Sequence, residues 1–191
     1  MSDMTTRRAD AVQNRIQLLR AAESVFLEFG VTAPLDLIVD RAKVSRATLF
    51  RNFADRQALT MALLELALQE VQEAADAVAD RDDGLLVVLR FIADRVAFRA
   101  PLHEYWHTSN PHLPEIQAAL DRLVSIFAAP VTRAVKAGLC REDLMPTDFV
   151  PLVTMMSTLV FGRTAEERRL LADRSWRLML DALKYSGSEE V

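Results

Sequence analysis

Basic and hydroxyl-bearing side chains are concentrated in one short stretch of this 191-residue sequence. Residues 41–56 contain five cations and a single carboxylate, whereas the whole chain has a net charge of −4. Arginine, threonine and asparagine side chains contact phosphates and base edges when a helix enters the major groove of DNA. Arg46, Thr48, Arg51 and Asn52 are residues of this kind. The stretch therefore indicates an anion-binding face on an otherwise acidic protein.

Helical periodicity predicts the elements that position these side chains. Apolar residues recur three and four apart from about Thr6 to Phe29, and Gly30 follows where a left-handed cap is expected. A short helix is expected over residues 34–42, and another from about Ser45, whose hydroxyl can cap it. Two short helices joined by a tight turn, the second of them basic, are typical of a helix-turn-helix.

The rest of the chain also has helical spacing. A fourth helix is expected after Asp55, continuing as a solvated connector to about residue 80, and another restarts after Gly84. Pro101, Pro111 and Pro114 should then break the chain around its three histidines. Three more helices are expected, over residues 114–138, 147–162 and 164–184. Pro130 should kink the first of these or mark a join, and Thr164 with Glu167 has the spacing of a capping box that opens the last.

The composition favours an all-α protein. Apolar residues make up 51% of the chain, glycine occurs only five times, and no segment has strand periodicity. Cys140 is the single cysteine, which excludes a disulfide scaffold and fits a cytoplasmic protein. No signal peptide or membrane-spanning apolar run is found, so no membrane partner is expected.

The segment from Ala21 to Leu59 resembles the DNA-binding domain of the TetR family of transcriptional regulators. The matching positions are Phe26, Gly30, Ile38, Ala42, Val44, Ser45, Thr48, Leu49, Phe53, Arg56 and Leu59. Three positions depart from the family pattern: Val39 replaces a small alanine, Lys43 the glycine of the turn, and Phe50 a tyrosine. Lys43 must either adopt a positive φ or change the turn, and it adds a charge beside the DNA.

The resemblance implies a helix-turn-helix domain over residues 6–59 and a helical ligand-binding and dimerisation domain over residues 80–186. It implies a regulator, most simply a ligand-relieved repressor, that binds an inverted-repeat operator in double-stranded DNA as a homodimer. The DNA contacts would come from Thr32, Pro34, Lys43, Ser45, Arg46, Thr48, Phe50, Arg51, Asn52 and Arg56.

The C-terminal half offers candidates for an interface and for an effector pocket. The segment 147–162 is apolar nearly all round, so we expect its helix to be covered by a second copy of the chain; the alternative is a helix wrapped within one monomer. The expected interface residues are Val153, Met156, Val160, Trp176, Met179 and Leu183. A small, largely apolar effector would lie among Phe91, Arg95, Phe98, Tyr105, Trp106, His107, Phe127, Met155 and Met156, unless these are ordinary core residues.

Other features of the sequence support alternative hypotheses about function. His103, His107 and His112 could mark a metal-dependent enzyme, although no nucleophile–base pair or phosphate loop accompanies them, and neither an enzyme nor a cofactor is expected. Lys43 and Phe50 leave open an interaction protein that no longer reads DNA. Arg141 beside Cys140 could lower the pKa of that thiol and create a redox sensor.

Overall fold

The computed structural model describes residues 2–109, 113–159 and 164–184 and divides the chain into two compact units. Unit 1 is Met1–Leu66 and unit 2 is Ala67–Val191, so the boundary falls within one helix. The elements are α1 (Ser2–Phe29), α2 (Leu35–Ala42), α3 (Arg46–Asn52), α4 (Arg56–Asp76), α5 (Gly84–Ser109), α6 (Pro114–Lys136), the 3-10 helix η1 (Pro146–Asp148), α7 (Phe149–Leu159) and α8 (Ala165–Lys184). The described residues contain no strand, which confirms the all-α prediction.

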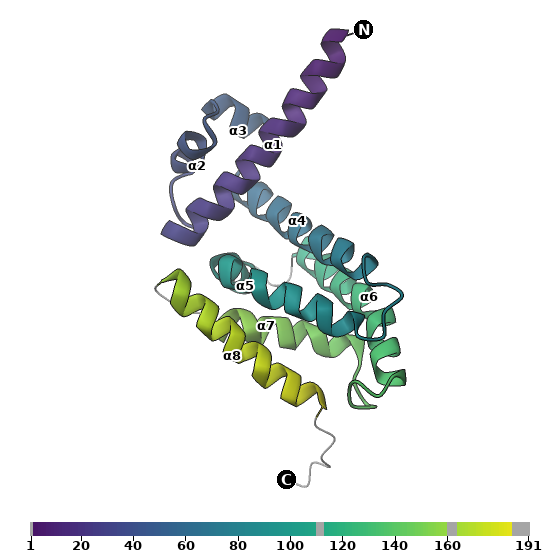
Figure 1. The fold of residues 1–191 in the computed structure, drawn as a ribbon. Helices are drawn as coiled ribbons and strands as arrows, with labels where there is room; N and C mark the ends of the chain where they lie inside the picture. The colour runs from purple at the N-terminus through teal and green to yellow at the C-terminus, as the bar shows by residue number, and fades with distance from the viewer. Residues whose placement is uncertain (1, 110–112, 160–163, 185–191) are drawn as a thin grey trace. The chain divides into compact units, whose positions relative to one another are not determined.

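Unit 1 is a small helical domain in which α1 packs on α2 and α3 (Figure 1). Its core residues come from all four helices: Leu18, Ala22, Val25, Phe26, Ile38, Leu49, Leu59 and Leu63 are almost fully buried. Gly30 ends α1 with a φ of 80°, and its N–H donates to the carbonyl of Phe26 at 2.9 Å. This is the left-handed cap expected from the sequence, a conformation that costs glycine little.

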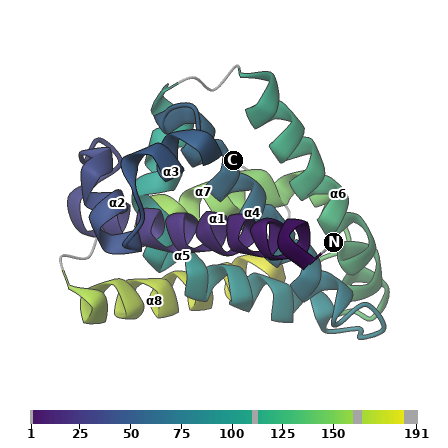
Figure 2. The ribbon, with the colours of Figure 1, turned by 90° about the horizontal axis from the view of Figure 1, so that it is seen from above.

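Unit 2 is built around α5, which contacts α6, α7 and α8 (Figures 1 and 2). Leu85, Val88 and Leu89 on α5 are completely buried. Phe127 on α6 stacks on Phe149 at the start of α7, with ring centroids 4.3 Å apart. These aromatic and aliphatic contacts fix the helices of unit 2 to one another.

The break expected at Pro101 is wrong, and the helix that contains Pro130 has no join there, while a kink at Pro130 stays a prediction. The helix α5 continues through Pro101 to Ser109, and α6 continues through Pro130 to Lys136. A proline removes one backbone hydrogen bond, but the buried residues on either side of each proline hold the helix in place. Leu102 and Trp106 are buried beyond Pro101, and Ala134 is buried beyond Pro130.

Two other local expectations are resolved by the contacts. Thr164 and Glu167 form the capping box at the start of α8, because each side chain accepts a hydrogen bond from the other residue's backbone N–H.

The second half of α4 is only partly solvated, since Leu68 and Ala75 are buried. Glu70 on α4 forms ion pairs with Arg95 at 2.7 Å and with Arg99 at 3.0 Å. In the described part of the chain, no helix combines the length and hydropathy needed to cross a bilayer.

Candidate nucleic-acid interface

The helix α3 presents a basic and aromatic face to solvent. Leu49 and Phe53 point into the core of unit 1, and this leaves Arg46, Phe50 and Arg51 exposed. Phe50 keeps 43% of its surface accessible, an unusual exposure for a large apolar side chain. The exposed face carries the residues that a helix needs to contact DNA in a major groove.

Ser45 starts α3 in the way its sequence position predicts. Its hydroxyl accepts a hydrogen bond from the backbone N–H of Thr48 at 3.1 Å and lies 2.8 Å from the Thr48 hydroxyl. Arg51 donates to the same Thr48 hydroxyl at 3.3 Å, and the Asn52 amide donates to the Thr48 carbonyl at 2.8 Å. These bonds hold the polar groups of α3 in fixed positions, so the helix offers a preorganised surface.

Arg46 is a highly accessible cation of this face. Its side chain is 68% exposed, its Nε lies 3.5 Å from a carboxylate oxygen of Asp36, and its guanidinium lies over the Phe50 ring at 5.7 Å. A solvent-exposed ion pair of this length contributes little free energy. Arg46 can therefore leave Asp36 for a base or a phosphate at small cost.

The turn between α2 and α3 contains a residue with strained backbone geometry. Lys43 has φ 53° and ψ 41°, which lie in the left-handed region. Of the two alternatives for this turn, a positive φ at Lys43 or a changed turn, the positive φ is therefore the one adopted. A residue with a Cβ there costs on the order of 1 kcal/mol relative to glycine. The exposed lysine side chain places a positive charge two residues before Ser45.

Arg56 lies in a different environment from the one expected. Its guanidinium donates hydrogen bonds to the backbone carbonyls of Val31 and of Ala33, the latter at 2.7 Å, and lies over the Phe26 ring. The side chain thus ties the start of α4 to the loop between α1 and α2. These bonds occupy part of the guanidinium, and the phosphate contact that the resemblance implies for Arg56 stays a prediction. Thr32 and Pro34 in or beside this loop are exposed, and Pro34 caps α2 without a side-chain hydrogen bond.

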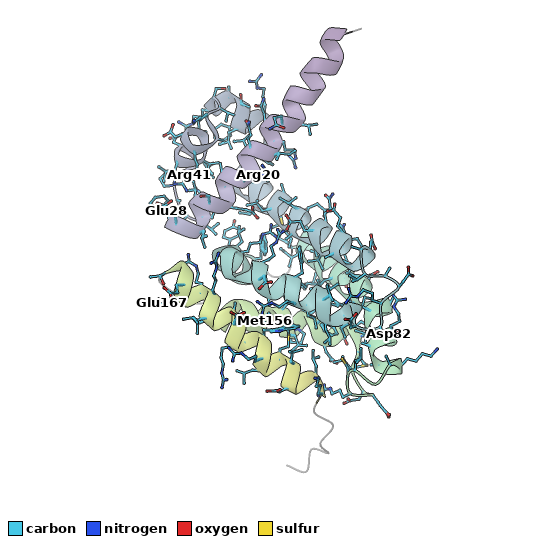
Figure 3. All side chains as sticks on the ribbon, in the orientation of Figure 1. Arg20, Glu28, Arg41, Asp82, Met156 and Glu167 are labelled. Atoms are coloured by element: carbon cyan, nitrogen blue, oxygen red, sulfur yellow. The ribbon has the colours of Figure 1, made fainter. Side chains whose placement is uncertain are left out.

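The tertiary contacts of two arginines in unit 1 were not anticipated. Arg15 donates to the carbonyl of Asn52 at 3.3 Å and lies over the Phe53 ring, which fixes α1 to the end of α3. Arg41 donates to Glu28 and to Ser24, which fixes α2 to α1 (Figure 3). The partners are far apart in sequence, so spacing along the chain gave no signal for these contacts.

The residues expected to form an effector pocket have mixed environments in unit 2. Phe127, Trp106 and Met156 are buried, Phe91 and Tyr105 are half-buried, and Met155 is 54% exposed. Phe127 is engaged by Phe149, and Arg95 pairs with Glu70 and lies over Phe91. The side chains of Phe98 and His107 lie outside the described residues.

The expected dimer residues are mostly covered by their own chain. Val153, Met156, Met179 and Leu183 are at most 8% exposed, Trp176 is half-buried, and Val160 lies outside the described residues. A side chain already buried within its protomer adds almost no area to an interface. The exposed apolar residues nearby are Met155, Leu170, Leu171 and Leu178. Periodicity missed them because these helices have apolar residues on more than one side.

Cys140 does not have the lowered pKa that was considered for a redox sensor. The thiol is buried, and burial raises its pKa from the usual value, an effect only partly opposed by Lys184. A thiol with a raised pKa is a poor nucleophile at neutral pH. The structure does not describe His112 or the side chains of His103 and His107. Among the side chains that it does describe, no three potential metal ligands lie close together.

Comparison with known proteins shows what the N-terminal unit and the fold are similar to. Residues 18–63 match the model of the bacterial regulatory proteins of the tetR family. The fold resembles the TetR transcription regulatory protein from Mycobacterium vanbaalenii, with 24% identity, a TM-score of 0.66, and coverage of 93% of this chain and 99% of that chain. It resembles the TetR transcriptional regulator SCO0520 from Streptomyces coelicolor, with 25% identity, a TM-score of 0.63, and coverage of 91% and 99%.

A third solved structure agrees with these two. The TetR family protein CprB from S. coelicolor A3(2) has a TM-score of 0.67 and 19% identity, with coverage of 94% of this chain and 93% of that chain. Among curated protein sequences, none matches this chain. The N-terminal unit therefore matches the tetR family of bacterial regulatory proteins, and the whole chain has the fold of solved TetR-family transcriptional regulators.

Proposed function

We propose that this DNA-binding regulator is a repressor that binds an inverted-repeat operator as a homodimer and is released by a small effector. The observation that carries the proposal is the exposed face of α3, on which Arg46 lies at the capped start of the helix and Phe50 and Arg51 lie in its second half. A helix with its N-terminal residues exposed in this way fits a major groove. Lys43 and Ser45 stand beside that helix start, and Thr32 and Pro34 stand exposed near the start of α2.

Dimerisation follows from the need to occupy two half-sites. We place the interface on the exposed apolar residues of α7 and α8, namely Met155, Leu170, Leu171 and Leu178. Apolar side chains exposed on neighbouring elements favour association with a second copy, since a C2 interface uses the same patch twice. Two recognition helices held in one dimer then read half-sites about one helical turn apart.

The effector would bind in unit 2 and act through α4, the helix that the two units share. Phe91 and Tyr105, half-buried on α5, supply aromatic surface for a largely apolar ligand. Binding would change the separation of the two recognition helices in the dimer. Helices at the wrong separation cannot occupy successive grooves together, so the operator would be released.

The experiment that tests this function is selection from random-sequence duplexes. The purified full chain is incubated with the pool at near-physiological salt, and the retained DNA is sequenced. An inverted repeat with half-site centres about one helical turn apart is expected. Recovery of no enriched sequence, with binding that is salt-dependent but blind to sequence, would support the interaction protein instead.

A pair of variants locates the reading helix on the selected operator. Arg46→Ala should weaken binding to the operator more than binding to unrelated DNA, with no change in the unfolding curve, because Arg46 is exposed. Lys136→Ala on α6 is the matched control, an exposed cation outside unit 1. Equal affinities of Arg46→Ala and the control would mean that α3 is not the element that reads the operator.

A further inference from the structure

A basic cleft lies between α1 and the end of α2 in unit 1. It has a volume of about 430 Å³ and is lined by Gln17, Arg20, Ala21, Ser24, Arg41, Ala42 and Lys43. Gln17, Arg20 and Ser24 follow one another at three- and four-residue spacing on α1, so they share one side of the helix. Figure 3 shows Arg20 on α1 near Arg41 of α2.

The charges of the cleft are not balanced within the chain. Arg41 is neutralised by Glu28 at 2.7 Å and is held by Ser24 at 2.8 Å. Arg20 and Lys43 have no carboxylate partner among the side chains that the structure describes. The cleft with Glu28 therefore carries an excess of two positive charges. Such a concave cationic site attracts an anion.

The cations are not required to end α2. The backbone N–H groups of Lys43 and Val44 donate to the carbonyls of Asp40 and Val39, so α2 is capped by its own main chain. Lys43 adopts a left-handed backbone conformation that glycine would adopt more cheaply. A strained residue with a free cationic side chain at the mouth of a cleft points to a role in binding.

We propose that this cleft binds a phosphate group of the DNA backbone next to the groove that α3 occupies. The proposal rests on the proposed function and extends its DNA contacts to Arg20, which lies outside the helix-turn-helix. Lys43 is two residues from Ser45, a distance of at most about 7 Å along the chain. A major groove is about 12 Å wide, so a phosphate row flanks the helix that occupies it. Arg20 offers its guanidinium fork, Lys43 its ammonium and Gln17 its amide as donors.

The test is the salt dependence of DNA binding by full-length variants. Arg20→Gln and Lys43→Gln are each titrated against the selected operator and against an unrelated duplex. Each lost phosphate contact should lower the slope of log K against log salt by about 0.9. The wild type should then lose about 3.5-fold more affinity than Arg20→Gln between 50 and 200 mM salt. The loss should be the same on both duplexes, because a phosphate carries no sequence information.

Two controls separate a local contact from net charge and from folding. Lys136→Gln removes an exposed cation from the last turn of α6 and should keep the wild-type slope. Arg20→Lys keeps the charge and should restore most of the slope. Circular dichroism and urea unfolding should be unchanged in Arg20→Gln, since Arg20 is exposed on α1.

The outcomes distinguish this inference from the proposed function. A wild type that binds its operator, with Arg20→Gln showing the same slope, overturns the cleft and leaves the function standing. A wild type that retains no DNA overturns both. The last arm uses inorganic pyrophosphate at millimolar concentration. If it raised the melting temperature of the wild type but not of Arg20→Gln, with the DNA slopes equal, the cleft would bind free phosphate compounds, and the DNA assignment would be wrong.

Discussion

The guanidinium of Arg56 donates a hydrogen bond to the backbone carbonyl of Ala33, 2.7 Å away. A second hydrogen bond reaches the carbonyl of Val31, and the Phe26 ring lies beneath the guanidinium. We expect Arg56→Gln to lower the free energy of unfolding by about 1.5–3 kcal/mol, because charge-assisted bonds to two carbonyls are lost. Urea unfolding followed by circular dichroism measures this change.

The matched control for Arg56 is Arg51→Gln. Arg51 is exposed on α3 and donates local hydrogen bonds to the Ala47 carbonyl and the Thr48 hydroxyl. Its substitution should weaken DNA binding with little effect on stability. If Arg56→Gln unfolded like the wild type and only reduced the salt dependence of DNA binding, Arg56 would be a phosphate contact after all.

Two substitutions separate the helix-capping role of Ser45 from its expected proximity to DNA. Ser45→Ala removes the hydrogen bond to the Thr48 N–H and should cost about 1 kcal/mol of stability. Ser45→Asp keeps an N-cap acceptor and should retain wild-type stability, but it puts a carboxylate beside the phosphates. Operator affinity should therefore fall more in Ser45→Asp than in Ser45→Ala, as measured by fluorescence anisotropy. The reverse order would place Ser45 away from the DNA.

The strain at Lys43 predicts a gain of stability on substitution. Lys43→Gly should raise the free energy of unfolding by about 1 kcal/mol, because the left-handed conformation no longer carries a Cβ penalty. Lys43→Gln keeps the penalty and removes the charge, so its stability should equal that of the wild type. Both variants should bind DNA more weakly. Equal stabilities of Lys43→Gly and Lys43→Gln in urea would show that the turn is not strained.

The buried thiol of Cys140 predicts slow alkylation of the folded protein and a loss of stability at alkaline pH. The raised pKa of Cys140 keeps the thiol neutral in the folded protein at pH values where the unfolded chain has begun to ionise. Its contribution to stability is thus complete below the unfolded pKa and is lost as pH rises towards the folded one. Iodoacetamide should label the native chain slowly at pH 8 and the urea-unfolded chain rapidly. The stability of Cys140→Ser should fall less between pH 8 and 10, and an identical fall would contradict this assignment.

Local rules were sufficient for the helix ends. Gly30 after α1, Ser45 before α3 and the Thr164–Glu167 box were all predicted from sequence, because each is decided by neighbours a few residues apart. The continuation of α5 through Pro101 was not predicted. That outcome depends on packing around Leu102 and Trp106, which a local proline rule does not contain.

The basic character of the site was predictable, but the partner of each cation was not. Five cations between residues 41 and 56 indicated an anion-binding face. Arg56, however, donates hydrogen bonds to backbone carbonyls, and Arg41 forms an ion pair with Glu28. Arg20 joins the cleft from 21 residues before Arg41, so only the packing of α1 on α2 places them together. Tertiary contacts of this kind leave no regular spacing in the sequence.

The exposed side of α8 gives the most direct test of dimerisation. Leu171 and Leu178 are seven residues apart, so they lie on one face of the helix, and Leu178 is 52% exposed. We expect Leu178→Glu to convert the dimer to a monomer at micromolar concentration, because the interface would have to bury an unpaired carboxylate. Since Leu178 is exposed in the single chain, the monomer should keep its helical content. Sedimentation velocity of Leu178→Glu beside Ala118→Glu, a carboxylate at an exposed position of α6, separates the interface from added charge. A Leu178→Glu protein that sediments as a dimer would move the interface away from this face of α8.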